Sequence, residues 1–360
     1  MKILHIINSL HFGGAEKLLL DTVPEYIQRG VETEILLLDG HKTPFYTDLM
    51  EKYQVKIHAN PRKYSIYNPL HILRIRRRIK HYDIVHVHLF PSLYWTALAT
   101  LFLRYTTKLI VTEHNTENRR RNVPLLKYID RYVYKKYDKI IAISEGVKEN
   151  LQKHLGKHHH TICTINNGID TQLFREAIPY SKNALGIPES AKIIVQVSSF
   201  TAQKDQNTLL KAISLVPEEV HLLLIGDGPL KEEKQELAFT LKINQNVHFL
   251  GYRTDIPQLL KTSDISVLSS HYEGFGLAIV EGMASGNPCV ASDVSGLSEV
   301  IGEAGILFEQ GDYIQLKEIL QQLLSDHEYY KKIQKKCTER AQQYDVSLMV
   351  DAYMNLYNTL

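Results

Sequence analysis

Short apolar runs alternate with longer amphipathic segments along the whole chain. The runs are rich in β-branched residues, whereas the segments between them, beginning with residues 15–29, repeat their apolar residues at helical spacing. Strands that alternate with helices are typical of parallel sheets, so the pattern predicts an α/β protein of the doubly wound type. The expected strands are residues 2–7, 34–38, 84–88, 109–112, 140–143, 193–197, 221–225, 247–250, 265–269, 289–291 and 305–308.

One polar segment, residues 170–190, interrupts this alternation with Pro179, Gly186 and Pro188. A chain of 360 residues is long enough for two domains, each with its own core. We therefore assign residues 1–175 to an N-terminal domain and residues 176–343 to a C-terminal domain. Sheets of this kind bind ligands at the carboxyl ends of their strands, which is where candidate residues are expected.

The most informative segment follows the predicted strand 265–269. It places Glu273 and Glu281 on either side of a turn, separated by seven residues, and then repeats apolar residues at helical spacing. Glycines in the turn, Gly274 and Gly276, allow close approach of a ligand. An exposed pair of carboxylates is the ordinary interpretation, but the surrounding strand, turn and helix favour an anion site at a helix N-terminus. Its amides would belong to Phe275, Gly276 and Leu277.

This segment, Glu-Gly-Phe-Gly-Leu-x-x-x-Glu, resembles the E-x7-E motif of retaining glycosyltransferases of family 4. The resemblance implies the GT-B fold, in which two Rossmann-like, doubly wound domains face each other across a cleft. It further implies that Glu281 accepts hydrogen bonds from the nucleotide ribose and Glu273 from hydroxyls of the transferred sugar. In that fold the last helix, here residues 344–360, packs back on the N-terminal domain.

The N-terminal half carries two further elements of the resemblance. Gly13 and Gly14 open a helix in a Gly-Gly-Ala-Glu-Lys sequence, where their amides would approach phosphate or sugar. His114 ends the predicted strand 109–112, at the position where family members place a histidine near the C6 hydroxyl of the sugar. The other strand histidines, His5, His86 and His88, are interpreted as core or rim residues without a role.

The C-terminal half resembles the family at three more strand ends. Lys204 matches the lysine that contacts the diphosphate, but Ser199 stands where the family has an arginine. A fixed cation that would stabilise the leaving group is thus missing. Gly226 lies in a Gly-x-Gly-Pro turn like that of the family, and Tyr252 and Arg253 follow the strand whose backbone commonly cradles the base. By the resemblance, these three residues and Ser199 are assigned to the donor-binding site.

Charge is unevenly distributed, although the formal net charge is only +2. Residues 1–170 carry 26 Lys and Arg against 16 Asp and Glu, with basic runs at 74–80, 119–121 and 135–136. Leu70, Leu73, Ile75 and Ile79 interleave with the first run, which favours peripheral association with an anionic membrane, at roughly 1 kcal/mol per basic residue. An equal alternative is that these basic residues form a solvated surface that binds no membrane. The acidic second half and the lack of an aromatic-basic motif argue against nucleic acid.

The resemblance and the residues together predict a retaining, metal-independent glycosyltransferase of the hexosyltransferase type. Same-face attack is expected because no carboxylate is left over as a nucleophile, and the lack of an Asp-x-Asp sequence predicts no metal cofactor. UDP is the commonest nucleotide of the sugar donors in the family. A glycan or polyprenyl-linked acceptor in capsule or other cell-surface polysaccharide synthesis suits the basic half.

The sequence also predicts a location. It has three scattered cysteines, and no apolar run approaches the ~20 residues of a membrane span. Both features predict a cytoplasmic protein, which would lie at the inner face of the plasma membrane if it binds lipid.

Two alternative functions stay open. One is a nucleotide-sugar 2-epimerase, and the other is a catalytically silent sugar-nucleotide-binding subunit, which the missing arginine at Ser199 would favour.

Overall fold

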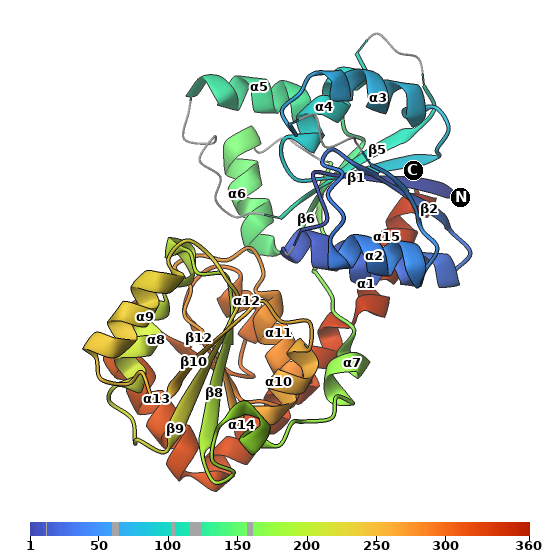
Figure 1. The fold of residues 1–360 in the computed structure, drawn as a ribbon. Helices are drawn as coiled ribbons and strands as arrows, with labels where there is room; N and C mark the ends of the chain where they lie inside the picture. Colours follow the sequence, from blue (N-terminus) through green and yellow to red (C-terminus); the bar gives the residue numbers. More distant parts are fainter. Residues whose placement is uncertain (12, 60–64, 102–104, 115–123, 157–160) are drawn as a thin grey trace. The chain divides into compact units, whose positions relative to one another are not determined.

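The structure, a computed structural model, describes residues 1–11, 13–59, 65–101, 105–114, 124–156 and 161–360. The chain forms two compact units: the first comprises Met1–Gly168 with Val346–Leu360, and the second comprises Ile169–Asp345. Each unit is built on one parallel sheet with helices packed on it (Figure 1). The prediction of two doubly wound α/β domains is confirmed.

The first unit has a seven-stranded sheet in the order β3-β2-β1-β4-β5-β6-β7. The order reverses between β1 and β4, and such a reversal is where doubly wound sheets bind ligands at the carboxyl ends of the strands. The strands are β1 (Lys2–Ile7), β2 (Glu32–Leu37), β3 (Lys56–His58), β4 (Ile84–His88), β5 (Lys108–Glu113), β6 (Lys139–Ala142) and β7 (Ile162–Thr164).

Helices cover both faces of this sheet. Alternate strand residues such as Leu4 and Val85 point to a core closed by α3 to α6, while their neighbours Ile3 and Ile84 point to a core closed by α1 and α15. The final helix α15 thus belongs to the first unit. The helices are α1 (Gly14–Gln28), α2 (Pro44–Glu51), α3 (Leu70–Ile79), α4 (Ser92–Ala99), α5 (Pro124–Tyr134), α6 (Glu145–Leu155) and α15 (Val346–Asn358).

The second unit has a six-stranded sheet in the order β10-β9-β8-β11-β12-β13, which reverses between β8 and β11. The strands are β8 (Lys192–Val197), β9 (Val220–Ile225), β10 (Val247–Gly251), β11 (Ile265–Leu268), β12 (Cys289–Ser292) and β13 (Ile306–Phe308). The helices are α7 (Thr171–Arg175), α8 (Gln206–Ile213), α9 (Lys231–Thr240), α10 (Ile256–Thr262), α11 (Leu277–Ala284), α12 (Leu297–Ile301), α13 (Tyr313–Ser325) and α14 (His327–Ala341).

The structure differs from the sequence expectations in three places. Strands β3 and β7 were not predicted, because three residues are too few to show an alternating pattern. Helix α7, within the range assigned to the first domain, packs on α10 and α11 of the second unit. In α3, Ile75 and Ile79 are fully buried in the core, so only Leu70 and Leu73 of the four apolar residues are exposed.

Within the part of the chain that the structure describes, no helix is long and apolar enough to cross a membrane.

Candidate active site

The segment that carries both glutamates runs from β11 into α11, as predicted. Helix α11 begins at Leu277, so the amides of its first turn lack carbonyl partners within the helix. Gly276 caps it with a φ of +90°, and a Cβ there would clash with the side chain of Leu297. Glu273 and Glu281 are both only 7% exposed, which contradicts the interpretation of the pair as solvated surface carboxylates. Phe275 is buried as well and packs edge-on against Tyr344.

Lys204 and Glu273, predicted from two separate motifs, form an ion pair. Lys204 lies in a 3₁₀ turn (Ala202–Lys204) after β8, and Glu273 lies in the turn after the neighbouring strand β11. The two residues are far apart in the sequence, and the reversal of strand order brings them together because it makes β8 and β11 neighbours. Ser270 also donates from Oγ to Oε1 of Glu273, at 2.8 Å. A bound diphosphate would compete with Glu273 for the Lys204 ammonium.

Buried amides and a buried hydroxyl hold the Lys204 turn in place. Gln196, in β8, donates to the Lys204 carbonyl at 3.2 Å and accepts from the Ser269 hydroxyl at 3.0 Å. Gln206, at the start of α8, donates to the Ser199 carbonyl at 2.9 Å. All three side chains, Gln196, Gln206 and Ser269, are at most 1% exposed. None of the three was predicted from the sequence, since single Gln and Ser residues carry no motif.

Gly226 and Ser199, both predicted to bind the sugar nucleotide, lie in neighbouring loops. Gly226 has a φ of +134°, and a Cβ there would clash with the Ser198 carbonyl. Its amide donates to the Gly251 carbonyl at 2.9 Å. The glycine thus serves the packing of the β9 loop on the β8 loop, and its N–H already has a partner. Ser199 is exposed.

Tyr252 and Arg253 follow β10 at the same edge of the sheet. Tyr252 is 58% exposed. Arg253 forms a forked pair with Asp255, and the Tyr180 hydroxyl donates to the same carboxylate at 2.7 Å. The bonds from Arg253 lower the pKa of Asp255 to about 2. The guanidinium therefore fixes the shape of its own loop.

In the first unit, Gly13 caps α1 and Gly14 is its first residue. The Glu16 carboxylate folds back over Gly13, where any Cβ would meet it. Burial raises the pKa of Glu16 to about 7. The predicted glycine turn is thus a helix N-terminus with a protonatable carboxyl beside it.

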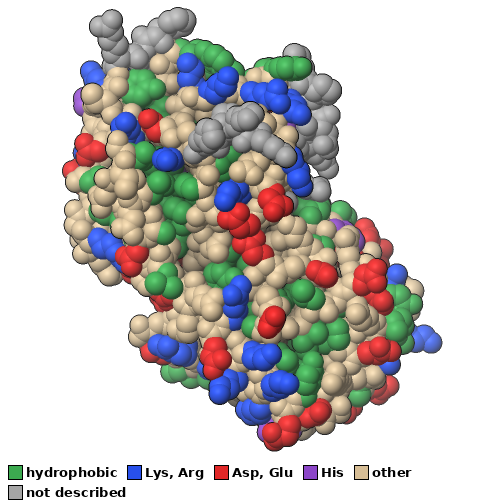
Figure 2. Space-filling view, turned by 180° about the vertical axis from the view of Figure 1, so that it is seen from behind, with side chains coloured by type: hydrophobic (Ala, Val, Ile, Leu, Met, Phe, Trp, Pro, Cys, Tyr) green, Lys and Arg blue, Asp and Glu red, His purple; other side chains and the backbone are tan. Residues whose placement is uncertain are grey.

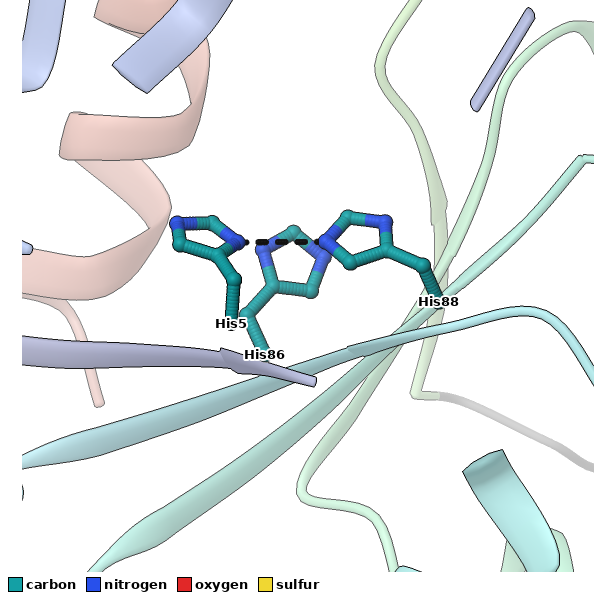
Figure 3. A group of neighbouring side chains, drawn as sticks. All are labelled: His5, His86 and His88. Carbon is teal, nitrogen blue, oxygen red and sulfur yellow. Dashed lines mark hydrogen bonds between the residues drawn. The ribbon is translucent and has the colours of Figure 1, made fainter. Parts of the chain in front are cut away.

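His114 follows β5 and is linked to histidines of two other strands. Nε2 of His114 lies 3.2 Å from Nδ1 of His88. Nε2 of His88 lies in turn 3.1 Å from Nδ1 of His5, a contact shown in Figure 3. Burial lowers the pKa of His114 to about 4, although Glu113 opposes the shift. His114 is therefore a neutral imidazole at neutral pH.

His5, His86 and His88 are all buried, as expected of core residues, but they also form a close group. Two features of the sequence could have revealed it: the Ile-Val-His-Val-His alternation of β4 puts His86 and His88 on one face, and His5 pairs with His86 across β1 and β4. The link from this group to His114 could not be read without the strand order. The basic run 119–121 lies outside the described residues.

Solved structures that match the two parallel-sheet α/β domains of this chain are GT-B glycosyltransferases. HepE of Anabaena, solved in complex with UDP-glucose, matches with a TM-score of 0.88 over 100% of both chains at 23% identity. WaaG, a glycosyltransferase of lipopolysaccharide biosynthesis, matches with a TM-score of 0.76 over 99% of both chains at 16% identity. The fold is therefore that of the GT-B class.

Sequence comparisons identify the family. The family model for Glycosyltransferase Family 4 matches residues 12–173, and that for Glycosyl transferases group 1 matches residues 178–343. N-acetyl-α-D-glucosaminyl L-malate synthase of Bacillus anthracis is 32% identical over 76% of this chain and 74% of its own length. The lipopolysaccharide core biosynthesis glycosyltransferase LpsE of Rhizobium meliloti is 25% identical over 99% of this chain and 98% of its own. The chain belongs to the family 4 glycosyltransferases.

Proposed function

We propose that the protein is a retaining glycosyltransferase that moves a sugar from a UDP-sugar to a glycan or polyprenyl-linked acceptor in cell-surface polysaccharide synthesis. The observation that carries the proposal is the cluster of Lys204, Glu273 and Ser270 beside the N-terminus of α11, with Glu281 on that helix. It supplies a cation, helix amides and hydroxyl acceptors within one small region, which matches the parts of a sugar nucleotide.

Relatives support the donor and the acceptor. HepE was solved with UDP-glucose and with UDP. An Escherichia coli relative, 28% identical over 64% of this chain and 63% of its own length, is named as a UDP-Gal:α-D-GlcNAc-diphosphoundecaprenol α-1,3-galactosyltransferase. A donor with a UDP group and an acceptor on a polyprenyl diphosphate are therefore the first pair to test.

Each site residue has a proposed task. Glu281 accepts from the ribose hydroxyls and Glu273 from the hydroxyls of the transferred sugar. Lys204 and the first amides of α11 hold the diphosphate, while Tyr252 and the backbone of the β10 loop face the base. His114 binds the sugar and Gly13 and Gly14 offer amides from α1. Arg253 and Gly226 act by shaping their loops.

The reaction is proposed to proceed by attack on the same face as the leaving group. The acceptor hydroxyl oxygen bonds to the anomeric carbon while the bond from that carbon to the diphosphate breaks, and the hydroxyl proton passes to the leaving phosphate oxygen. Lys204 and the helix amides stabilise the charge that develops there, so no metal is required.

The acceptor side is proposed to lie on the first unit, held at the cytoplasmic face of a membrane. Leu70 and Leu73 of α3 are about half exposed beside Arg76 and Arg77. Figure 2 shows Lys and Arg side chains on the visible face of this unit. A lipid-linked acceptor would be reached from such a surface.

Ligand-dependent melting tests the donor part of the proposal. A UDP-sugar is expected to raise the melting temperature of the wild type, and to raise that of Glu281→Ala much less. GDP- and ADP-sugars serve as the comparison, and transfer to a polyprenyl-linked acceptor is then followed by product mass. If no sugar nucleotide shifts the melting temperature, the donor site is wrongly assigned. Binding without transfer to any acceptor would instead favour a silent subunit.

A further inference from the structure

Three histidines in the first unit form one hydrogen-bonded series that ends at the proposed sugar-binding residue. His5 Nδ1 meets His88 Nε2 at 3.1 Å, and His88 Nδ1 meets His114 Nε2 at 3.2 Å. Figure 3 shows the first of these bonds passing beside the ring of His86. His86 is outside the series, because its nitrogens bond the hydroxyls of Tyr357 and Thr112 at 2.7 and 2.6 Å.

All members of the series are neutral, since burial lowers the pKa of His5 to about 3, that of His88 well below its usual range and that of His114 to about 4. A neutral imidazole carries one proton, and its position is set by the bonds that the two nitrogens make. Within each contact one nitrogen must donate and the other must accept. The proton positions of the three rings are therefore coupled.

The inner end of the series decides its direction. His5 Nε2 is buried and has no hydrogen-bond partner among the described residues. A proton on that nitrogen would leave a buried N–H unpaired, whereas a proton on Nδ1 is used in the bond to His88. His88 Nε2 then accepts, so the proton of His88 lies on Nδ1 and is donated to His114. His114 Nε2 accepts in turn, which leaves its proton on Nδ1.

We propose that His5 and His88 are positioning residues that lock His114 in the Nδ1–H tautomer. This inference rests on the proposed function, in which His114 contacts the transferred sugar. His114 then presents a hydrogen-bond donor, so the sugar must offer an oxygen that accepts, such as a hydroxyl or a carboxylate. The hydrogen-bonded series thereby contributes to the selectivity of the site for its sugar.

A metal ion is a different occupant for the same nitrogens, because His5, His86 and His88 lie close enough together to share one. Two observations favour the hydrogen-bonded series. The contact between His5 and His88 has the length of a hydrogen bond, and both nitrogens of His86 are already bonded to hydroxyls.

Long-range ¹H–¹⁵N correlation spectra of the full-length protein, labelled with ¹⁵N-histidine, test the tautomers directly. Signals are assigned by single substitution of His5, His88 and His114. The Nδ1–H pattern is expected for all three rings at neutral pH. An Nε2–H pattern or a charged ring at His114 would overturn the proposal, as would binding of one equivalent of Zn²⁺ by His5, His86 and His88.

Two substitutions at His88 separate positioning from packing. An Asn amide can occupy the place of Nδ1 and still donate to His114, whereas a Gln amide reaches the place of Nε2 and cannot. We expect His88→Asn to keep the Nδ1–H pattern at His114 and His88→Gln to lose it. His86→Gln is the matched control, a buried neighbour outside the series, and should leave the His114 pattern unchanged.

Kinetics of these variants then link the tautomer to sugar binding. In His88→Gln the KM for the sugar nucleotide is expected to rise by about threefold to tenfold, as for loss of one hydrogen bond, with a smaller change in kcat. Equal effects of Asn and Gln on the spectrum and on KM would show a purely structural role. Absence of transfer in the wild type would count against the proposed function, while the tautomer result would stand by itself.

Discussion

The Lys204 ammonium and the Glu273 carboxylate form an ion pair that joins the loop after β8 to the turn before α11. Both side chains are largely buried, and Ser270 donates to the same carboxylate oxygen. An ion pair in such surroundings is held in place before any ligand binds. When a sugar nucleotide enters, its diphosphate can draw on Lys204 while hydroxyls of the sugar satisfy Glu273.

Substitution of Glu273 by Gln tests this arrangement. The amide can still accept from Ser270, but the negative partner of Lys204 is lost and the sugar hydroxyls bind a weaker acceptor. We expect kcat/KM for the sugar nucleotide to fall on the order of 10²-fold, mainly through kcat. Glu281→Gln is the matched control and should raise KM more than it lowers kcat. Unchanged steady-state kinetics in Glu273→Gln would remove Glu273 from the site.

Ser199 offers a test by gain of function. The side chain is exposed, and its loop is anchored through the backbone by Gln206, so an arginine can be accommodated without burial of its charge. A second cation near the diphosphate would stabilise the leaving group. We expect Ser199→Arg to raise kcat, on the order of tenfold, whereas Ser199→Gln, similar in length but uncharged, should not. A fall in kcat for the arginine variant alone would contradict the assignment.

Glu16 makes stability depend on pH. Burial raises its pKa from 4.5 to about 7, so folding favours the protonated carboxyl. This contribution to stability is complete below about pH 4.5, declines as the pH rises toward 7, and is absent above. The melting temperature of Glu16→Gln, relative to that of the wild type, is therefore expected to increase from pH 5 to pH 8. A difference that does not change with pH would show that the carboxyl ionises normally.

The basic face of α3 gives a prediction about membranes. Arg76 and Arg77 are exposed on the same helix as Leu70 and Leu73. Replacement of both arginines by Gln should weaken sedimentation with phosphatidylglycerol vesicles by about 30-fold, from roughly 1 kcal/mol per charge. The control is Lys332→Gln with Lys335→Gln, which removes two exposed charges from α14 in the second unit. Equal losses in both variants would indicate non-specific attraction.

The parts of the site that follow from local sequence were predictable. The turn from Glu273 to Leu277 and the glycine cap of α1 depend on residues close together in the chain, and the structure places them as expected. The pairing of Lys204 with Glu273 and the series from His5 to His114 depend on strand order instead. Strand order is decided by the packing of the whole sheet, and a single sequence does not display it.

Gly226 illustrates a residue whose type was informative while its task was not. It was predicted to bind the sugar nucleotide, but the group closest to where a Cβ would lie is the Ser198 carbonyl, and its own amide donates to the Gly251 carbonyl. Both explanations require a glycine, so the sequence could not separate them. The positive φ of Gly226 and its contact with the Ser198 carbonyl together predict the effect of an alanine at this position.

Alanine at Gly226 must tolerate a φ of +134° and a clash with the Ser198 carbonyl, whereas alanine at Gly186 meets only a φ of +72° in open space. We expect Gly186→Ala to cost about 1 kcal/mol and Gly226→Ala about 3 kcal/mol or more, because backbone cannot move aside as a side chain can. Melting temperatures of the two variants measure the difference. Since the β8 loop also carries Lys204, transfer activity should fall in Gly226→Ala and stay near wild type in Gly186→Ala. Equal destabilisation would mean that positive φ alone, rather than the contact between the two loops, requires the glycine.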